Sequence, residues 1–227
     1  MRKSGLGLLT VLALGFGIET AAADILRALY SPHPVASWTN FYVGGNIGYG
    51  WARGSATTTI GGVSNTVSGD LDGVIGGGQI GLNAQFGSWV LGVESDIQLS
   101  GQKLTLSGVS GGLAFTETHK ITWFGTTRAR AGIAAERMLI YATGGVGYGE
   151  AKSSLTVAGL GTVSVSKVRL GWALGGGVEG MITPAWSWKA EYIYFDTGNF
   201  TDNVFGVPIR LRLKDNIVRF GVNYRFR

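Results

Sequence analysis

Apolar and polar residues alternate one by one along several stretches of this chain. The clearest is the last, 216–226, where Val218, Phe220 and Val222 are separated by Arg219 and Gly221. Because successive side chains of a β-strand point to opposite sides, this pattern predicts a strand with one apolar and one polar face. The same alternation predicts seven earlier strands, near residues 40–51, 73–86, 89–99, 120–133, 138–150, 167–182 and 186–196.

The connections between these strands alternate in length. The first, third, fifth and seventh are long and polar, and they cover 52–72, 100–119, 151–166 and 197–213. The others are short, at 87–88, 135–137 and 183–185. In an antiparallel meander this places every long loop at one end, as in outer-membrane barrels. We therefore predict an all-β fold, an eight-stranded antiparallel up-and-down transmembrane β-barrel over 38–227.

The apolar face is expected to point outward to lipid. Aromatic residues near strand ends on that face are typical of the girdles at the two lipid–water interfaces. They are Phe41, Trp51, Phe86, Trp89, Trp123, Trp188, Tyr194 and Phe226. In 120–133 we expect Ile121 and Trp123 both to face outward. In 138–150, which lacks a polar face, we favour Ile140, Ala142, Val146 and Tyr148 as the outward set.

The N-terminus has the architecture of a cleaved signal peptide. Arg2 and Lys3 precede an apolar run over 6–18, and small residues at 21–23 precede Asp24. We expect residues 1–23 to be removed and 24–37 to form an extended periplasmic lead-in. No later stretch is long and apolar enough for a spanning helix.

Composition narrows the function classes. The 227 residues contain no Cys, so disulfide and thiolate chemistry are excluded. The net charge of +5 comes from scattered basic residues, which does not indicate nucleic-acid binding. Gly is abundant, with 39 residues, as expected for tightly packed strands in a narrow barrel.

Charged residues within the strands fall on the face opposite the apolar one. We expect eight of them to interlock and fill the lumen: Glu94, Asp96, Arg128, Arg130, Glu179, Lys189, Glu191 and Arg219. Arg169 is expected on the same face. An eight-stranded barrel encloses little more than side chains, which favours a plugged interior. The alternative is a gated path of low conductance in which the ion pairs exchange partners.

The last long connection carries three alternating basic residues, Arg210, Arg212 and Lys214. Outside the membrane they are placed to contact lipopolysaccharide phosphates, or they belong to a solvated β-extension.

Catalytic and cofactor motifs do not emerge. Two G-x-G-x-x-G matches, at 76–81 and 175–180, are not followed by a helical pattern, so they indicate strand glycines rather than a nucleotide site. His33 and His119 are not spaced with other residues as a catalytic group, and His, Asp and Glu do not cluster at ligand spacing. We expect no enzyme activity, no cofactor and no metal.

Five segments carry a family resemblance: 38–50, 126–132, 140–149, 189–194 and 218–226. They resemble the small alphaproteobacterial outer-membrane β-barrel proteins, which include outer membrane immunogenic proteins and haemin-binding relatives. The resemblance implies an OmpA-type barrel, inserted by the barrel-assembly machinery through its C-terminal strand. The family usually ends on an aromatic residue, whereas Arg227 follows Phe226 here.

Two function classes stay open at this stage. The first is a structural surface protein that acts in envelope integrity or surface contacts through four extracellular loops. The second is a narrow porin or a protein that binds haemin or another small ligand. An enzyme that acts on lipid A is a distant third.

Overall fold

The computed structural model describes residues 37–60, 63–110, 113–159, 161–204 and 207–226. The expected signal peptide, all of the expected lead-in except Ser37, and Arg227 lie outside these residues. No helix in this part of the chain is long and apolar enough to cross a membrane.

The described residues form one antiparallel sheet. Its strands are β1 (Asn40–Ile60), β2 (Val63–Phe86), β3 (Trp89–Ser100), β4 (Lys103–Ser110), β5 (Leu113–Ala135), β6 (Met138–Val157), β7 (Gly161–Met181), β8 (Trp186–Asp196), β9 (Phe200–Val204) and β10 (Val207–Phe226).

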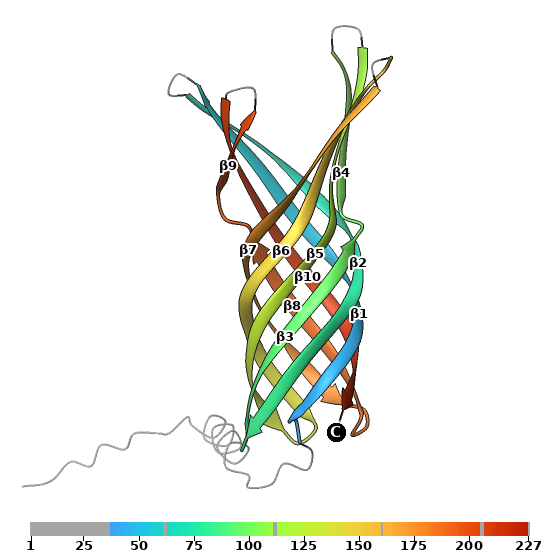
Figure 1. Cartoon of the computed structure of the whole chain (residues 1–227), viewed down its shortest axis with the longest axis vertical. Coiled ribbons are helices and arrows are strands. Elements are labelled where there is room, and N and C mark those ends of the chain that lie inside the picture. The colour runs from blue at the N-terminus through green and yellow to red at the C-terminus, as the bar shows by residue number, and fades with distance from the viewer. Residues whose placement is uncertain (1–36, 61–62, 111–112, 160, 205–206, 227) are drawn as a thin grey trace, which may run out of the picture.

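Eight of these strands close into a ring, as predicted. The pairing runs β1–β2–β3–β5–β6–β7–β8–β10 and returns from β10 to β1. Figure 1 shows the strands wound steeply around a common axis. The remaining two, β4 and β9, pair only within projecting hairpins at one end, where β4 joins β5 and touches β2 at Lys103, and β9 joins β10.

The long connections are at one end of the barrel, and their described residues are mostly strand rather than loop. The segments predicted as connections at 52–72 and 151–166 largely continue the flanking strands, so that β1 and β2 stay paired up to Ile60 and Val63. Hydroxyl groups bond across the extensions, as between Thr57 and Thr66 at 2.8 Å. Thr and Val favour extended backbone, and Thr and Ser hydroxyls bond across strands, which explains why polar sequence extends the sheet beyond the membrane. Figure 1 shows these extensions splayed to two sides.

The opposite end has tight turns. Gly87 sits at φ 62° between β2 and β3, a conformation that glycine adopts without steric cost. The C-terminal end of β10 lies at this end too (Figure 1).

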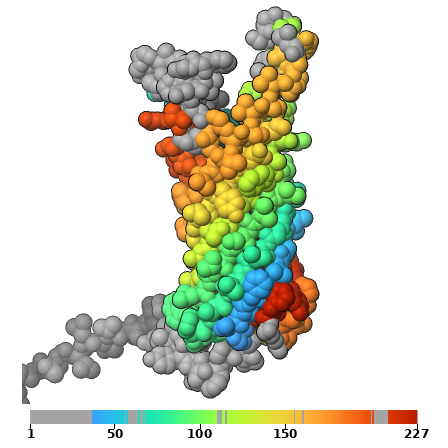
Figure 2. Space-filling model, viewed as in Figure 1, coloured from blue at the N-terminus to red at the C-terminus, as the bar shows by residue number. Residues whose placement is uncertain are grey.

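The two faces of the strands point as predicted. On β10, Val218, Phe220 and Val222 are exposed on the outside, whereas Arg219 and Asn223 are buried inside. The outward register favoured for β6 is also confirmed by the exposure of Ile140 and Val146. Figure 2 shows the ring from outside as an unbroken wall of side chains below the splayed extensions.

Ile121 is a correction. It was expected to face outward beside Trp123, but it is 5% exposed and packs inside the barrel. The pairing of β5 with β6 shifts register between Ile121 and Trp123. Such a β-bulge adds one residue to one strand and inverts the alternation beyond it.

Aromatic side chains form two belts on the outer surface. Near the turns, Phe41 contacts Phe226 and Trp186 contacts Tyr224. At the other end, ring contacts join Tyr49 with Trp51, Trp123 with Tyr148, and Trp172 with Tyr194. We call this second set the upper belt and the first the lower belt. The segment between them is the part expected to lie in lipid.

Position relative to these belts predicts tolerance to charge. Val93 lies mid-strand on β3 and Val165 lies on the β7 extension, and the two are equally exposed, at 52% and 53%. V93R is expected to lower the free energy of unfolding by about 2 to 4 kcal/mol, because it places a guanidinium in the hydrocarbon, whereas V165R costs at most about 1 kcal/mol. Urea unfolding in lipid vesicles, followed by tryptophan fluorescence, measures both. Equal losses would contradict a lipid boundary between the two sites.

Candidate functional site

All eight charged residues predicted for the lumen lie inside the ring and are buried. They come from β3, β5, β7, β8 and β10, and they comprise four carboxylates and four cations. Strand register already places opposite charges side by side: Glu94 faces Arg128, Glu179 faces Lys189, and Glu191 faces Arg219. Direct cross-strand neighbours of opposite charge attract each other. We refer to these eight residues as the lumen network.

Glu94 is the centre of the lumen network. Its Oε1 accepts hydrogen bonds from Lys189 Nζ at 2.7 Å, Arg128 Nη2 at 2.8 Å and Arg219 Nη2 at 3.2 Å. Its Oε2 accepts one from the Tyr42 hydroxyl at 2.8 Å. Three strands besides its own thus direct cations at one carboxylate, and a fourth supplies a hydroxyl.

The two other central carboxylates bridge the same cations. Arg219 lies 3.0 Å from Asp96 and 2.6 Å from Glu191. Arg128 contacts the same two carboxylates, each at 3.0 Å. Each guanidinium therefore joins three carboxylates, so that the charges are shared rather than divided into separate pairs. Charges buried with this many partners are compensated, whereas an isolated one would be very costly.

Arg130 extends the lumen network toward the turns. It donates to Glu179 at 2.8 Å and to the Tyr42 hydroxyl at 2.9 Å. Its guanidinium lies 4.0 Å from the ring centre of Tyr141, a cation–π contact. Glu179 also accepts from Ser187 at 2.6 Å and Asn223 at 3.0 Å, which satisfies its other oxygen.

Glycines make room for the two central arginines. Gly48 on β1 is paired with Arg219, and a Cβ there would lie 2.8 Å from the Arg219 Cβ. Gly145 on β6 is paired with Arg128, and a Cβ there would lie 2.7 Å from the Arg128 Cα. The glycine-rich strands and the charged strands are therefore complementary parts of one interior.

Apolar clusters lie on both sides of the lumen network along the barrel axis. On the side of the extensions, Ala52, Leu71, Ile75, Ile121, Phe124, Ala173, Ile193, Phe195 and Ile217 pack together. On the side of the turns, the cluster comprises Trp38, Val90, Ala134, Leu139, Tyr141 and Met181. We call these the upper and lower apolar layers. Trp38 is fully buried, and the Arg225 guanidinium lies 4.8 Å from its ring centre.

The three basic residues predicted to contact lipopolysaccharide, Arg210, Arg212 and Lys214, are on the outer face of β10 beyond the upper belt. Arg212 binds Asp196 at 3.1 Å and 2.5 Å. Burial favours the neutral acid, but hydrogen bonds from Arg212 and the Gly198 N–H outweigh it and lower the pKa of Asp196 below its ordinary value. Arg210 is exposed, and Lys214 is paired in register with Arg53 of β1.

Arg169, expected on the polar face, does point inward, but it is half-buried and lines a cavity above the upper apolar layer. Tyr42 and Tyr141, which contact the lumen network, were not among the candidate site residues of the sequence. A signal exists for Tyr42, because the inward positions next to it on β1 are Asn40 and Gly44.

Removing one cation should expose the strength of the lumen network. R219M is expected to lower the free energy of unfolding by about 3 to 5 kcal/mol, because it leaves buried carboxylates short of a partner. R210M is the matched control on the exposed part of the same strand and should stay within about 0.5 kcal/mol of wild type. Urea unfolding in vesicles measures both, and an R219M barrel as stable as R210M would contradict a structural role for the ion pairs.

Comparison with known proteins agrees with this architecture. The family described as outer membrane protein beta-barrel domain matches residues 8–226. The chain is 36% identical to the 31 kDa outer-membrane immunogenic protein of Brucella melitensis, over 96% of this chain and 98% of that protein. It is 30% identical to the 22 kDa outer membrane protein of Rhizobium leguminosarum, over 85% of this chain and 80% of that protein. It is 29% identical to the 25 kDa outer-membrane immunogenic protein of Brucella abortus, over 94% and 93% of the two chains.

The expected resemblance to alphaproteobacterial surface barrels is thereby confirmed. The chain belongs to the outer membrane protein beta-barrel domain family and is an outer-membrane protein.

Proposed function

We propose that this protein is a sealed structural barrel of the outer membrane, which presents four β-hairpin extensions at the cell surface and acts in envelope integrity or surface contacts. The observation that carries this proposal is the filling of the lumen. Charged side chains occupy its middle, and apolar side chains occupy the interior on either side.

Each part of the interior opposes passage for a different reason. An ion that enters the lumen network has to displace carboxylates or guanidinium groups that already have several partners. The apolar layers offer it no hydrogen bonds in place of its hydration shell, and hydrophobic constrictions of this kind close channels by excluding water. This supports the plugged interior over the narrow porin.

Haemin binding has less support. His119 is the one histidine among the described residues, and both of its ring nitrogens have partners. Nδ1 lies 2.8 Å from the Ser153 hydroxyl and Nε2 lies 2.9 Å from Glu117. Axial ligation of haem iron would have to displace one of these contacts.

Conductance tests the sealed barrel. The wild-type protein in a planar bilayer is expected to show no persistent open level, because all three parts of the interior are occupied. The same preparation should show a heat-dependent gel shift, which verifies that the barrel is folded. Stable, ohmic steps from shifted protein would contradict the proposal.

We further propose that Arg210 and Lys214 contact lipopolysaccharide phosphates. Both lie on the outer face of β10. The upper belt crosses β10 at Asn216, which is paired with Trp51, and both cations lie beyond this level on the side of the extensions. Arg53 adds a third cation beside Lys214, and its ion pair with Asp70, at 3.4 Å, is exposed. Phosphate groups are favourable partners for such cations. Arg212 is not included, because its guanidinium is already paired with Asp196 of β8.

Charge reversal on opposite ends of the barrel separates this contact from a general charge effect. The R210E/K214E variant should lose the rise in thermal midpoint that added lipopolysaccharide gives the wild type, because phosphates and carboxylates repel. R137E carries a reversal in an exposed turn at the opposite end, distant from the lipopolysaccharide leaflet, and should keep the rise. An unchanged response of R210E/K214E would exclude the contact.

A further inference from the structure

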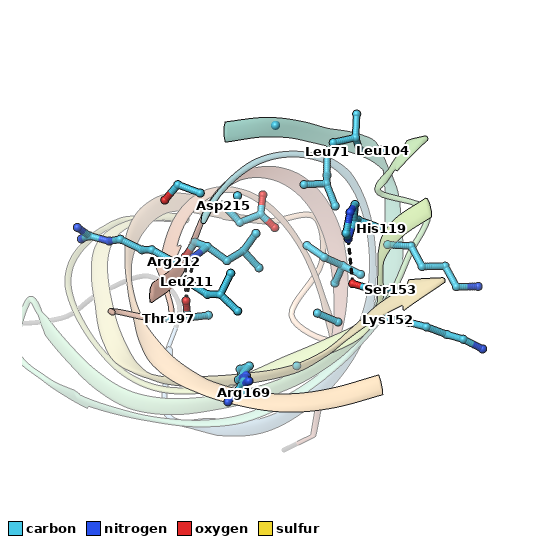
Figure 3. Close-up of a pocket in the computed structure, with 18 of the residues that line it drawn as sticks. Leu71, Leu104, His119, Lys152, Ser153, Arg169, Thr197, Leu211, Arg212 and Asp215 are labelled. Atoms are coloured by element: carbon cyan, nitrogen blue, oxygen red, sulfur yellow. Dashed lines mark hydrogen bonds between the residues drawn. The ribbon is translucent and has the colours of Figure 1, made fainter. Parts of the chain in front are cut away.

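A cavity of about 280 Å³ lies inside the mouth of the barrel, above the upper apolar layer. Figure 3 shows it surrounded by side chains that come from strands all around the ring. Its lining extends from buried residues such as Leu71 and Phe124 to exposed ones such as Leu106 and Ser68. The cavity is therefore closed at its lower end by the upper apolar layer and opens at its upper end among the hairpin extensions.

The walls of the cavity are mainly apolar. The residues responsible are Leu71, Leu104, Ile121, Phe124, Phe195, Leu211 and Leu213. Several of them belong to the upper apolar layer or pack against it, so that the floor is dry and well packed. Water in such a cavity finds few hydrogen-bonding partners, and an apolar ligand that replaces it gains free energy.

Few charged groups of the described residues point into the cavity, and Arg169 is the cation among them. Arg169 is half-buried on one wall, and His119 lies near the rim with its hydrogen bond to Ser153. Asp215 lies on the opposite side from Arg169 (Figure 3) and accepts a hydrogen bond from Gln102 at 3.0 Å. Lys152 and Arg212 also contribute to the lining but point away from the centre of the cavity (Figure 3).

From this arrangement we propose that the cavity binds a small free carboxylate with one aliphatic chain, such as a medium-chain fatty acid. The chain occupies the apolar floor, and the carboxylate lies toward Arg169. The volume is just below the range of about 300 to 1,000 Å³ that is usual for small-molecule sites, which favours a single chain over a macrocycle. Binding takes place above the sealed interior and requires no passage through it.

One glycine of the lining permits a clean test by filling the cavity. A Cβ on Gly54 of β1 would meet its nearest neighbours, Leu71, Gly69 and Leu213, at 3.8 to 4.0 Å, which is ordinary contact. G54L therefore places a side chain in the cavity without a backbone clash. Gly45 of the same strand faces outward, and its Cβ would meet Gly77 at 3.8 Å. G45L is thus the matched control on the lipid side.

The probe is octanoate, titrated calorimetrically into protein in phosphatidylcholine nanodiscs, with empty nanodiscs subtracted. Wild type and G45L should bind one equivalent saturably, and G54L should bind at least tenfold more weakly. R169Q should weaken octanoate at least fivefold and leave octanol unchanged, because only the acid uses the cation. The heat-dependent gel shift verifies that each variant is folded.

Three results would overturn the proposal. One is a titration that does not differ from that of empty nanodiscs. Another is equal binding by folded G54L and G45L. The third is loss of octanoate binding when an anionic lipid is added to the nanodiscs, which would assign the cavity to a membrane lipid rather than to a free acid.

Discussion

Closure of the ring between β1 and β10 is the constraint on which the rest of this structure depends. The seam joins residues far apart in the chain, from Phe41 opposite Phe226 to Thr58 opposite Ile209. Backbone groups in lipid have no water to bond, so an open edge there is prohibitively costly. Closure satisfies both edges, and it also forces one face of every strand into a narrow interior.

That interior explains features that appear unrelated along the sequence. Charged residues can occupy it only if their signs balance and each has partners, and Glu94 meets this requirement by receiving groups from four other strands. Glycines on β1 and β6 provide the space that the central arginines occupy. The apolar layers on either side separate the charges from bulk water. A low local dielectric strengthens each of these hydrogen bonds and raises the cost of leaving any group unpaired.

Much of this was predictable because the period of a β-strand is two. Alternation alone placed Arg219, Glu191 and the other lumen charges on one face. It does not state whether that face is inside or outside. The signal peptide, the one-sided long connections and the aromatic residues near strand ends together indicated that the charged face is the inner one. Alternation fails where its period is broken, and the bulge before Trp123 turns Ile121 inward. No residue type near the bulge predicts it from the sequence. Polar composition likewise suggested loops where Ser and Thr continue the strands. The partners of Glu94 depend on how far side chains reach across the ring, which no local pattern encodes.

Cross-linking of the seam tests ring closure most directly. The chain has no Cys, so a pair introduced at Ile47 of β1 and Phe220 of β10, which are directly opposite, is free of competing thiols. Opposite residues in antiparallel strands have Cα atoms about 4.5 to 5.5 Å apart, within disulfide reach. The I47C/F220C variant should form a disulfide on mild oxidation in the membrane, and the offset pair I47C/Y224C should not. Failure of the first pair to cross-link, or equal cross-linking of both, would contradict the closed ring.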